Sequence, residues 1–433
     1  MKHLLRSASL AGVAAVALTL SACGGGDDAA QDSGEVAPTD AQAEITYAIW
    51  DENQKDAIDQ NVKDFNEKYP NIKVTVDLTP YQQYFTKLQT QGESRTLPDV
   101  FWMNGPNVQL YAANDLLQPI TGLVEAGELD PANYPEPMNE LYTFEGAQYA
   151  VPKDFDTVAL WYNKALFEKA GVDLPTDDWT WEEFTDAATT ISDELSDDGV
   201  YGVVTELNGG GQSSYYDSIL QAGGHVISED GTTSGYDDPA SIEGLQLWAD
   251  LVADGGSPTV QQLSDTKPAV WFSSGKAAMM WSGNWSVAEL KDSANKDDFG
   301  TVRLPAGPEQ RATVIHGVGN VVAAHSENKA AANAFLAYLG SEEAQRTQAE
   351  MGAANPAFTG TQQAFVDSVP NFGIQVFLDS AEDMAFPYPI SQNTAAWNAL
   401  ENELLPQAFS GKRPVEEVAQ ELADSMNAEL AKE

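Results

Sequence analysis

The feature that most constrains the fold is an alternation of short apolar runs with amphipathic stretches, which begins at Glu44. ITYAIW is typical of a buried strand, and apolar residues at helical spacing follow it at 58–69. The pattern repeats with a strand at 72–78, a short helix at 84–91 and a strand at 99–103. Strands separated by helices of this length predict right-handed βαβ crossovers and a parallel sheet covered on both faces. The predicted fold class is therefore α/β.

A second α/β segment follows. It opens with YAVPKDFDTVALWYN at 149–163, and Thr180-Trp-Glu-Glu183 has the spacing of a capping box that begins a helix. The further predicted segments are a strand at 199–204, a flexible loop at 208–216, a strand at 276–285, a Pro/Gly-rich crossover at 304–310, a strand at 315–324, and helices at 328–339, 341–351, 374–385, 391–409 and 414–431. Two such segments in 433 residues indicate more than one domain.

Residues 1–22 have the pattern of an export signal, because basic residues precede an apolar run, Leu10–Leu20, that is too short to cross a membrane. Leu20-Ser21-Ala22-Cys23 resembles a bacterial lipobox, in which Cys23 is lipidated and becomes the new N-terminus. The alternative is an ordinary secretory signal with an incidental cysteine. After the signal, residues 23–43 are mostly small, acidic and aperiodic, and we expect them to form a flexible tether.

Charge and missing motifs exclude several function classes. The formal net charge is −44, which argues against binding to nucleic acids or to an anionic membrane surface. The histidines beyond the signal, His225, His316 and His325, are far apart in the sequence. No zinc, phosphate-loop or nucleophile-elbow motif is present, so we expect no metal, no cofactor and neither nucleotide nor serine-hydrolase chemistry.

Aromatic residues next to short polar residues indicate a neutral polyol as ligand. An aromatic ring can cover the C–H face of a pyranose, while carboxylates and amides bind the hydroxyls around its edge. The densest group is Trp281-Ser-Gly-Asn-Trp285; Trp50, Asp51 and Asn104 lie where predicted strands end, at the sheet edge where α/β proteins bind ligands. For any one of these tryptophans, a place in the core is an equally good interpretation.

Asp154 and Asp156 also have two interpretations. They are either hinge or capping carboxylates, or the general acid and base of a hydrolase.

An ordered set of segments resembles the bacterial extracellular solute-binding proteins of carbohydrate ABC transporters, the family that includes maltose-binding protein. The resemblance covers nearly the whole chain after the signal. The segments that carry it, in order, are IWDENQKDAIDQNVKDFNEKYPNIKVTV, LPDVFWMN, KDFDTVALWYNKALFEKAG, WTWEEF, GKAAMMWSGNW, VGNVVAAHSENKAAANAFLAYLGSEEAQ and YPISQNTAAWNAL.

The resemblance implies two α/β lobes with parallel sheets, joined by hinge crossovers near 150–156 and 305–317, with the ligand between them. It places lobe one at 44–153 plus 311–358 and lobe two at 154–310 plus 359–433. The ligand-binding residues that it implies are Trp50, Asp51, Asn104, Asp154, Asp156, Tyr215, Trp281, Gly283, Asn284, Trp285, Gly317 and Trp397. The segment FWMNGP lacks the charged pair that maltose binders carry there, which argues against maltodextrin as the ligand.

The implied function is capture of a mono- or oligosaccharide and its delivery to the permease of an ABC importer, without catalysis. The protein would act as a monomer, held by its lipid on the extracellular face of the bacterial cytoplasmic membrane. Two other classes stay open: an exported, lipid-anchored glycoside hydrolase, and a binding protein for a non-sugar solute such as a peptide or a polyamine.

We predict that Cys23 is lipidated, because the residues before it resemble a lipobox. Mass spectrometry of the membrane fraction should find an N-terminal, acylated Cys23. A released protein with an unmodified Cys23 thiol would show that the signal is an ordinary secretory one.

Overall fold

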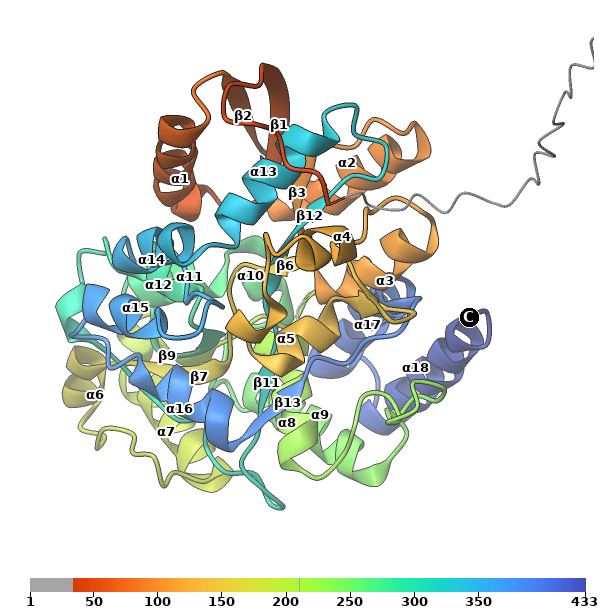
Figure 1. The fold of residues 1–433 in the computed structure, drawn as a ribbon. Helices are drawn as coiled ribbons and strands as arrows, with labels where there is room; N and C mark the ends of the chain where they lie inside the picture. The colour runs from red at the N-terminus through yellow and green to blue at the C-terminus, as the bar shows by residue number, and fades with distance from the viewer. Residues whose placement is uncertain (1–33, 210) are drawn as a thin grey trace, which may run out of the picture. The chain divides into compact units, whose positions relative to one another are not determined.

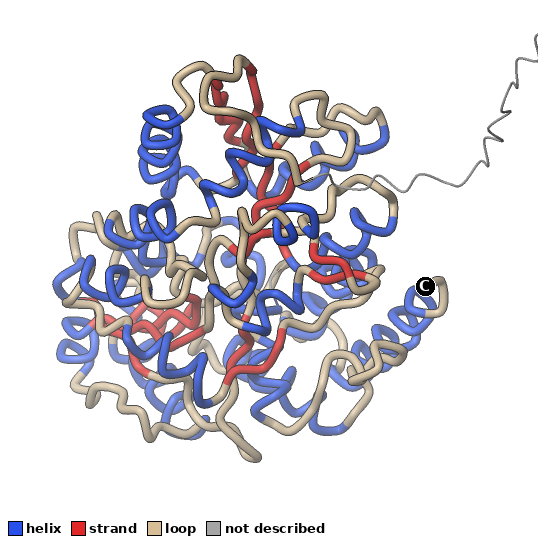
Figure 2. Tube along the Cα trace, viewed as in Figure 1, coloured by secondary structure: helices blue, strands red, loops and turns tan. Residues whose placement is uncertain are grey.

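The computed structural model describes residues 34–209 and 211–433 (Figure 1). The export signal, Cys23 and part of the expected tether lie outside these residues. None of the helices among the described residues is long and apolar enough to cross a membrane. Two larger sheets organise the chain, and most of the helices lie on their outer sides (Figure 2).

The first sheet has five strands in the order β2-β1-β3-β12-β6. β1 (Ala43–Ile49), β2 (Ile72–Leu78) and β3 (Val100–Asn104) are parallel, as the alternation predicts. β12 (Val318–Val322) is antiparallel to its neighbours β3 and β6 (Val151–Pro152), because the chain returns from the second sheet at the edge where β3 ends. We call this sheet with the helices on it the five-stranded half.

Aromatic side chains dominate the core of the five-stranded half. The ring of Phe335 contacts those of Tyr47 and Phe65, with centroid distances of 5.2 and 5.0 Å. Buried Trp102 donates to the Tyr47 hydroxyl (2.6 Å), which donates to Asn320 (2.7 Å), so these polar atoms are satisfied. The other elements here are η1 (Glu52–Gln54), α1 (Lys55–Lys68), α2 (Tyr81–Glu93), α3 (Gly105–Ala113), α4 (Thr121–Glu125), η2 (Pro131–Asn133), α5 (Glu136–Leu141), β4 (Thr143–Phe144), β5 (Ala147–Gln148), α13 (Lys329–Leu339) and α14 (Glu342–Glu350).

The second sheet has four strands in the order β10-β7-β9-β8. β7 (Val158–Asn163) is antiparallel to β9 (Ala277–Gly283) and to β10 (Phe299–Val302), and only β8 (Tyr201–Val204) runs parallel to β9. The predicted α/β class is therefore realised with mixed sheets rather than with parallel sheets alone. We call this sheet with its helices the four-stranded half.

Helices enclose the four-stranded sheet. The capping box at Thr180 and Glu183 is confirmed at the start of α7 (Trp181–Glu194), where each residue accepts the backbone N–H of the other. α17 (Thr394–Phe409) and α18 (Val415–Leu430) pack on each other and on α9 (Pro239–Ala253). The remaining elements are α6 (Lys164–Ala170), η3 (Ser196–Asp198), η4 (Gly211–Ser213), α8 (Tyr215–Gln221), α10 (Val260–Asp265), α11 (Pro268–Ser273), α12 (Ser286–Leu290), η5 (Lys296–Asp298), α15 (Gln362–Ser368) and α16 (Gln375–Asp383).

Three chain segments connect the halves side by side, at 153–157, 313–318 and 353–358. Asp156 and His316 exchange backbone hydrogen bonds of 2.8 and 3.1 Å, and Asp154 forms a β-bridge with Pro356. β11 (Thr313–Ile315) begins the second segment and pairs with β13 (Ala385–Pro387). The first two segments fall where the sequence predicts hinge crossovers, and the third ends at 358, where the expected division into lobes also changes from one lobe to the other.

Two local expectations are wrong. Residues 208–216 are not one flexible loop: Gly211–Ser213 form a helical turn, α8 begins at Tyr215, and Ser214 Oγ donates to the Glu206 carbonyl (2.8 Å). Residues 34–42 do not all belong to a free tether, because the backbone N–H of Ala37 donates to Ala330 on α13 (2.8 Å). The folded unit therefore begins before Glu44.

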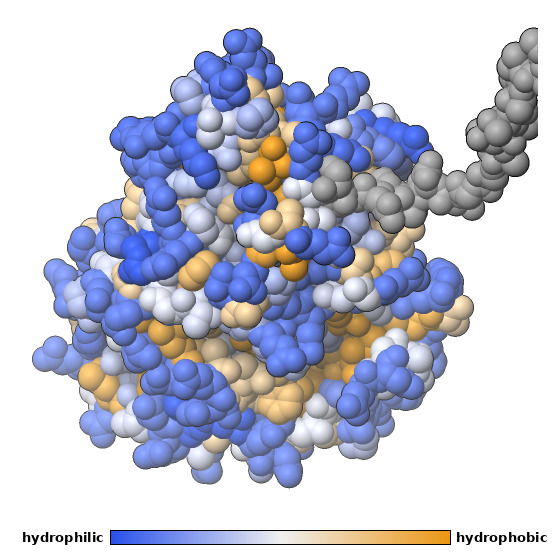
Figure 3. Space-filling view, in the orientation of Figure 1, coloured by the Kyte–Doolittle hydropathy of each residue, from blue (hydrophilic) through white to orange (hydrophobic). Residues whose placement is uncertain are grey.

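Hydrophilic residues cover most of the face in Figure 3, and apolar residues gather mainly in a band that crosses β13.

Candidate functional site

The carboxyl ends of the parallel strands bring aromatic and polar side chains to one edge of the five-stranded sheet, as such strands do. Trp50, directly after β1, is half-buried and packs edge-on against Tyr81 and Trp102, with ring centroids 5.6 and 5.0 Å away. Asn104, at the end of β3, donates to the Tyr81 hydroxyl (3.4 Å) and is only 4 % exposed. Tyr81 itself is 51 % exposed, whereas Trp50 is half-buried and Trp102 is fully buried.

Asp51 is held in place at the same edge. Its carboxylate accepts the backbone N–H of Asn53 (2.9 Å) and the side-chain amide of Gln54 (3.0 Å), and the residue is partly exposed. Carboxyl oxygens fixed in this way can accept further hydrogen bonds from ligand hydroxyls.

Asp154, Asp156 and Gly317 lie on the crossovers. Asp154 is paired with Lys153 (2.7 Å) and accepts the Val318 N–H (2.7 Å). A Cβ on Gly317 would lie 2.3 Å from the Asp154 carbonyl oxygen, so only glycine fits there. Asp156 accepts a hydrogen bond from Gln212.

Burial raises the pKa of Asp156 to about 8, and the charge of Asp154 adds to the rise, while the hydrogen bond from Gln212 opposes it. The Asp156 carboxyl therefore retains its proton at neutral pH. It can then donate a hydrogen bond as well as accept one.

His316 ties the return crossover to the end of β3. Its Nε2 accepts the backbone N–H of Gly105, the residue after Asn104, at 3.1 Å. Burial lowers the pKa of His316 to about 3, so the ring is neutral and Nε2 is free to accept.

In the four-stranded half, the turn after β9 faces the crossover. Asn284 donates through its amide to the Phe155 carbonyl (3.1 Å) and is 3 % exposed. The ring of Trp285 lies across Gly283, where a Cβ would come within 1.9 Å of the indole, and Trp285 is partly exposed. Any side chain at position 283 would collide with the indole, so the position of the Trp285 ring requires a glycine there.

Three of the predicted ligand-binding residues are core residues instead. Trp281 is fully buried between Phe184 and Trp248, and its indole donates to Asp217 (2.9 Å). Trp397 is also fully buried, and Tyr215 is 1 % exposed. The cause for Trp281 is that both faces of β9 are covered, so the strand has no open side.

Tyr215 belongs to a buried cluster around Glu401. The Glu401 carboxylate accepts hydrogen bonds from three tyrosine hydroxyls and from the amide of Asn398 (2.9 Å); the tyrosines are Tyr215 (3.3 Å), Tyr216 (3.0 Å to each oxygen) and Tyr236. Burial raises the pKa of Glu401 to about 7, and the four donors oppose this rise. The cluster joins α17 to α8 and to the segment before α9.

The nine other predicted ligand-binding residues lie at the strand ends, on the crossovers and on the turn after β9, and contacts of the first crossover connect these places. Phe155, on the first crossover, contacts the turn of Asn284, while Lys153 contacts Gln54 beside Asp51. Sequence reasoning missed Tyr81, Gln212, Lys153 and Glu401, and only Tyr81 had a signal, as an aromatic directly after a predicted strand and Pro80.

No three His, Cys, Asp or Glu side chains among residues 34–209 and 211–433 are grouped as metal ligands. A cavity of about 290 Å³ lies elsewhere, and none of the residues discussed above lines it. It is bordered by side chains of both charges, among them Lys291, Asp297 and Glu350. The strand-end group therefore remains the better candidate, because it combines aromatic faces with fixed hydrogen-bond acceptors.

Comparisons with known proteins show which family the chain is similar to. Residues 51–346 match the family described as bacterial extracellular solute-binding protein. The chain is 24 % identical over 444 residues to the diacetylchitobiose binding protein of Streptomyces coelicolor, with 98 % of each chain covered. It is 25 % identical over 356 residues to the galactooligosaccharide-binding protein of Bacillus subtilis, covering 79 % of this chain and 78 % of the relative.

The fold is also similar to a solved structure. An ABC substrate-binding protein from Listeria monocytogenes in complex with cycloalternan has a TM-score of 0.84 and 27 % identity, covering 90 % of this chain and 100 % of that chain. The similarity confirms the predicted fold class.

We predict that Glu401→Gln stabilises the protein more at pH 8 than at pH 5. The folded pKa of about 7 lies above the usual 4.5, so wild type loses stability as pH rises between these values. The full difference between the folded pKa and the usual pKa of Glu401 corresponds to about 3 kcal/mol in the free energy of unfolding. Urea unfolding at both pH values measures it.

Glu403→Gln, on an exposed position of the same helix, is the matched control and should show no such pH dependence. If the free energies of unfolding of wild type and Glu401→Gln changed with pH in parallel, burial would not disfavour the charged form of Glu401.

Proposed function

The chain belongs to the bacterial extracellular solute-binding proteins, and from this premise we propose that it captures a mono- or oligosaccharide and delivers it to the permease of an ABC importer. The observation that carries the proposal is the pairing of aromatic faces with fixed acceptors where the two halves meet. Tyr81 and Trp285 present ring surface from opposite halves. Asp51 and Asp156 supply oxygens that suit the hydroxyls of a sugar.

The relatives support a sugar as the class of ligand. The proteins from Streptomyces coelicolor and Bacillus subtilis are named for diacetylchitobiose and galactooligosaccharide, and the Listeria structure is a complex with cycloalternan. Sequence identities near one quarter leave the particular sugar to experiment.

We place the ligand between two lobes, at 44–153 plus 311–358 and at 154–310 plus 359–433. The separate cores support this division. The buried core of the five-stranded half comes from 37–155 and 315–357, and that of the four-stranded half from 158–314 and 349–430. Closure of the lobes would follow from ligand contacts that exist only in the closed state.

The carboxyl groups on the crossover support binding rather than catalysis. A glycoside hydrolase needs one carboxyl group to give a proton and a second that is free to act as base or nucleophile. Asp154 is committed to the Lys153 ammonium and to the Val318 N–H, so it is not free for the second role. The hydrolase alternative would be supported by turnover of a glycan, and the non-sugar alternative by binding of a peptide or a polyamine.

We also propose an oligomeric state, a membrane anchor and a protein partner for the chain. We infer that the protein is a monomer, anchored through a lipid on Cys23 to the extracellular face of the cytoplasmic membrane, with the permease as its protein partner. The lipobox-like residues before Cys23 support the anchor.

We predict that Trp285→Ala weakens sugar binding by about 2 kcal/mol or more, as loss of an aromatic anchor does, and leaves the melting temperature nearly unchanged. A thermal-shift screen of the purified protein against maltotriose, cellotriose, galactobiose, arabinotriose and diacetylchitobiose would first identify a bound sugar. Calorimetry with that sugar then compares the variant with wild type.

Trp179→Ala is the matched control. Trp179 is also half-buried, but it packs against Phe167 in the four-stranded half, with ring centroids 6.2 Å apart. This variant should lose stability and keep its affinity. Unaltered affinity in a folded Trp285→Ala protein would show that the platform lies elsewhere.

A further inference from the structure

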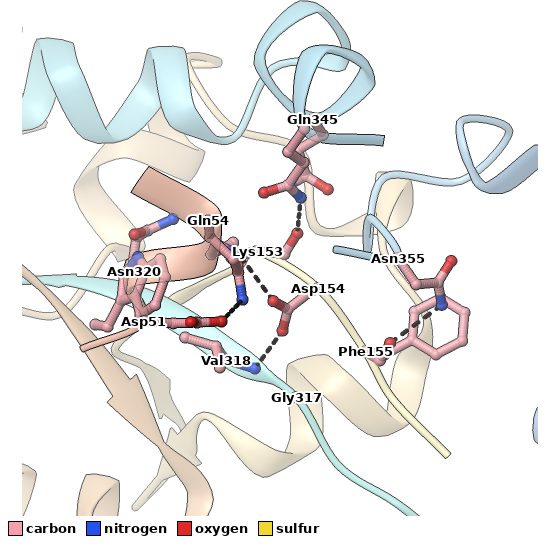
Figure 4. A network of polar contacts seen from close by, with 12 residues as sticks. Asp51, Gln54, Lys153, Asp154, Phe155, Gly317, Val318, Asn320, Gln345 and Asn355 are labelled. Carbon is pink, nitrogen blue, oxygen red and sulfur yellow. Dashed lines mark hydrogen bonds and ion pairs between the residues drawn. The ribbon is translucent and has the colours of Figure 1, made fainter. Parts of the chain in front are cut away.

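A chain of polar contacts runs from the crossover to the sheet edge of the five-stranded half (Figure 4). At its centre is Lys153, whose ammonium donates to Gln54 Oε1 (2.7 Å) and to Asp154 Oδ2 (2.7 Å). Gln54 in turn donates through Nε2 to Asp51 (3.0 Å), and Asp154 accepts the backbone N–H of Val318 (2.7 Å). Three separate parts of the chain are thus connected through one ammonium group.

Along this series of polar contacts, burial decreases from Lys153 to Asp51. Lys153 is 3 % exposed and Asp154 and Gln54 are each 6 % exposed, whereas Asp51 at the far end is partly open to solvent. The Lys153 ammonium also lies 4.7 Å from the centre of the Trp102 ring, and Trp102 packs against Trp50. The buried members therefore lie beneath the two residues that the sequence places at the ligand, Trp50 and Asp51.

A buried ion pair is a poor source of stability, because desolvation of both charges offsets most of their attraction. Its place in the fold requires another explanation. The Lys153–Asp154 pair occupies the crossover itself, and its hydrogen bonds lead to a side chain that faces the proposed ligand.

The same crossover also supports the opposite half. The Phe155 carbonyl accepts the amide of Asn284, next to Trp285, and the amide of Asn355 on the third connecting segment, each at 3.1 Å. Lys153 and Phe155, two positions apart on one segment, therefore contact Gln54, which binds Asp51, and Asn284, which precedes Trp285 in the chain.

We propose that Lys153 is a positioning residue: through Gln54 its buried ammonium sets the orientation of the Asp51 carboxylate toward the sugar, without touching the sugar itself. The proposal rests on the proposed function. It assigns the orientation of a ligand-binding group to residues that lie below the binding surface.

The test is a double-mutant cycle in the full-length protein, with Gln54→Met, Asp51→Ala and their combination, read by calorimetry. Gln54→Met removes the amide and leaves the Lys153–Asp154 pair intact, so the protein should fold. We use the same five sugars, maltotriose, cellotriose, galactobiose, arabinotriose and diacetylchitobiose, and continue with one that wild type binds. Lys153→Met is measured in parallel, alone and combined with Asp51→Ala.

Gln54→Met should weaken binding about tenfold in the wild-type background and less than twofold when Asp51 is already alanine, because interacting residues are not additive. Lys153→Met should behave in the same way. Lys169→Met, which removes an exposed lysine paired with Asp198 (2.7 Å), is the matched control and should leave affinity unchanged.

Equal losses of affinity in both backgrounds would overturn the positioning role and leave a general structural one. Full affinity in Asp51→Ala would also overturn it, because the carboxylate would then not contact the sugar. A wild type that binds none of these sugars, yet binds a peptide or a polyamine, would overturn the proposed function together with this inference.

Discussion

The main-chain contacts between the connecting segments are the constraint on which the rest of the structure depends. Asp156 and His316 exchange backbone hydrogen bonds, and Phe155 donates its N–H to Asn355 at 3.2 Å. Gly317 makes this possible, since any side chain there would collide with the Asp154 carbonyl. Both sheets are built outward from these segments, because β6 and β12 enter the five-stranded sheet and β7 enters the four-stranded sheet directly from them.

This constraint also explains why the candidate site lies where it does. Segments that cross between two sheets must pass the edge where the parallel strands end, which is where α/β proteins bind ligands. The crossover residues therefore have neighbours in both halves: Gln54 for Lys153, and Asn284 for Phe155. Residues at the ends of secondary-structure elements can absorb changes in backbone angles while each half stays intact.

Local sequence signals predicted most of the fold. The strand at 72–78 and the capping box at Thr180 depend on residues close in the chain, and both are found as predicted. Contacts between distant segments were not predictable in this way. Glu401 needs three tyrosines from two separate stretches of the chain, and Lys153 needs Gln54, which lies 99 positions earlier.

The tryptophans show which part of the candidate site could not be predicted from the sequence. Trp281 and Trp285 occur in one short motif, yet the first is in the core and the second reaches the surface. Side chains alternate between the two faces of a strand, but this alternation distinguishes core from surface residues only when one face is open. Both faces of β9 are covered. The position of Trp285 depends instead on the turn at Gly283, whose lack of a side chain lets the indole lie across it.

The central claim of this account is that a sugar is held between two halves that turn about the three connecting segments. Small-angle X-ray scattering of the purified protein, with and without a sugar that calorimetry shows to be bound, tests it most directly. We expect the radius of gyration to fall when the sugar saturates the protein, because the halves close on it. An unchanged radius of gyration at saturation would contradict the account.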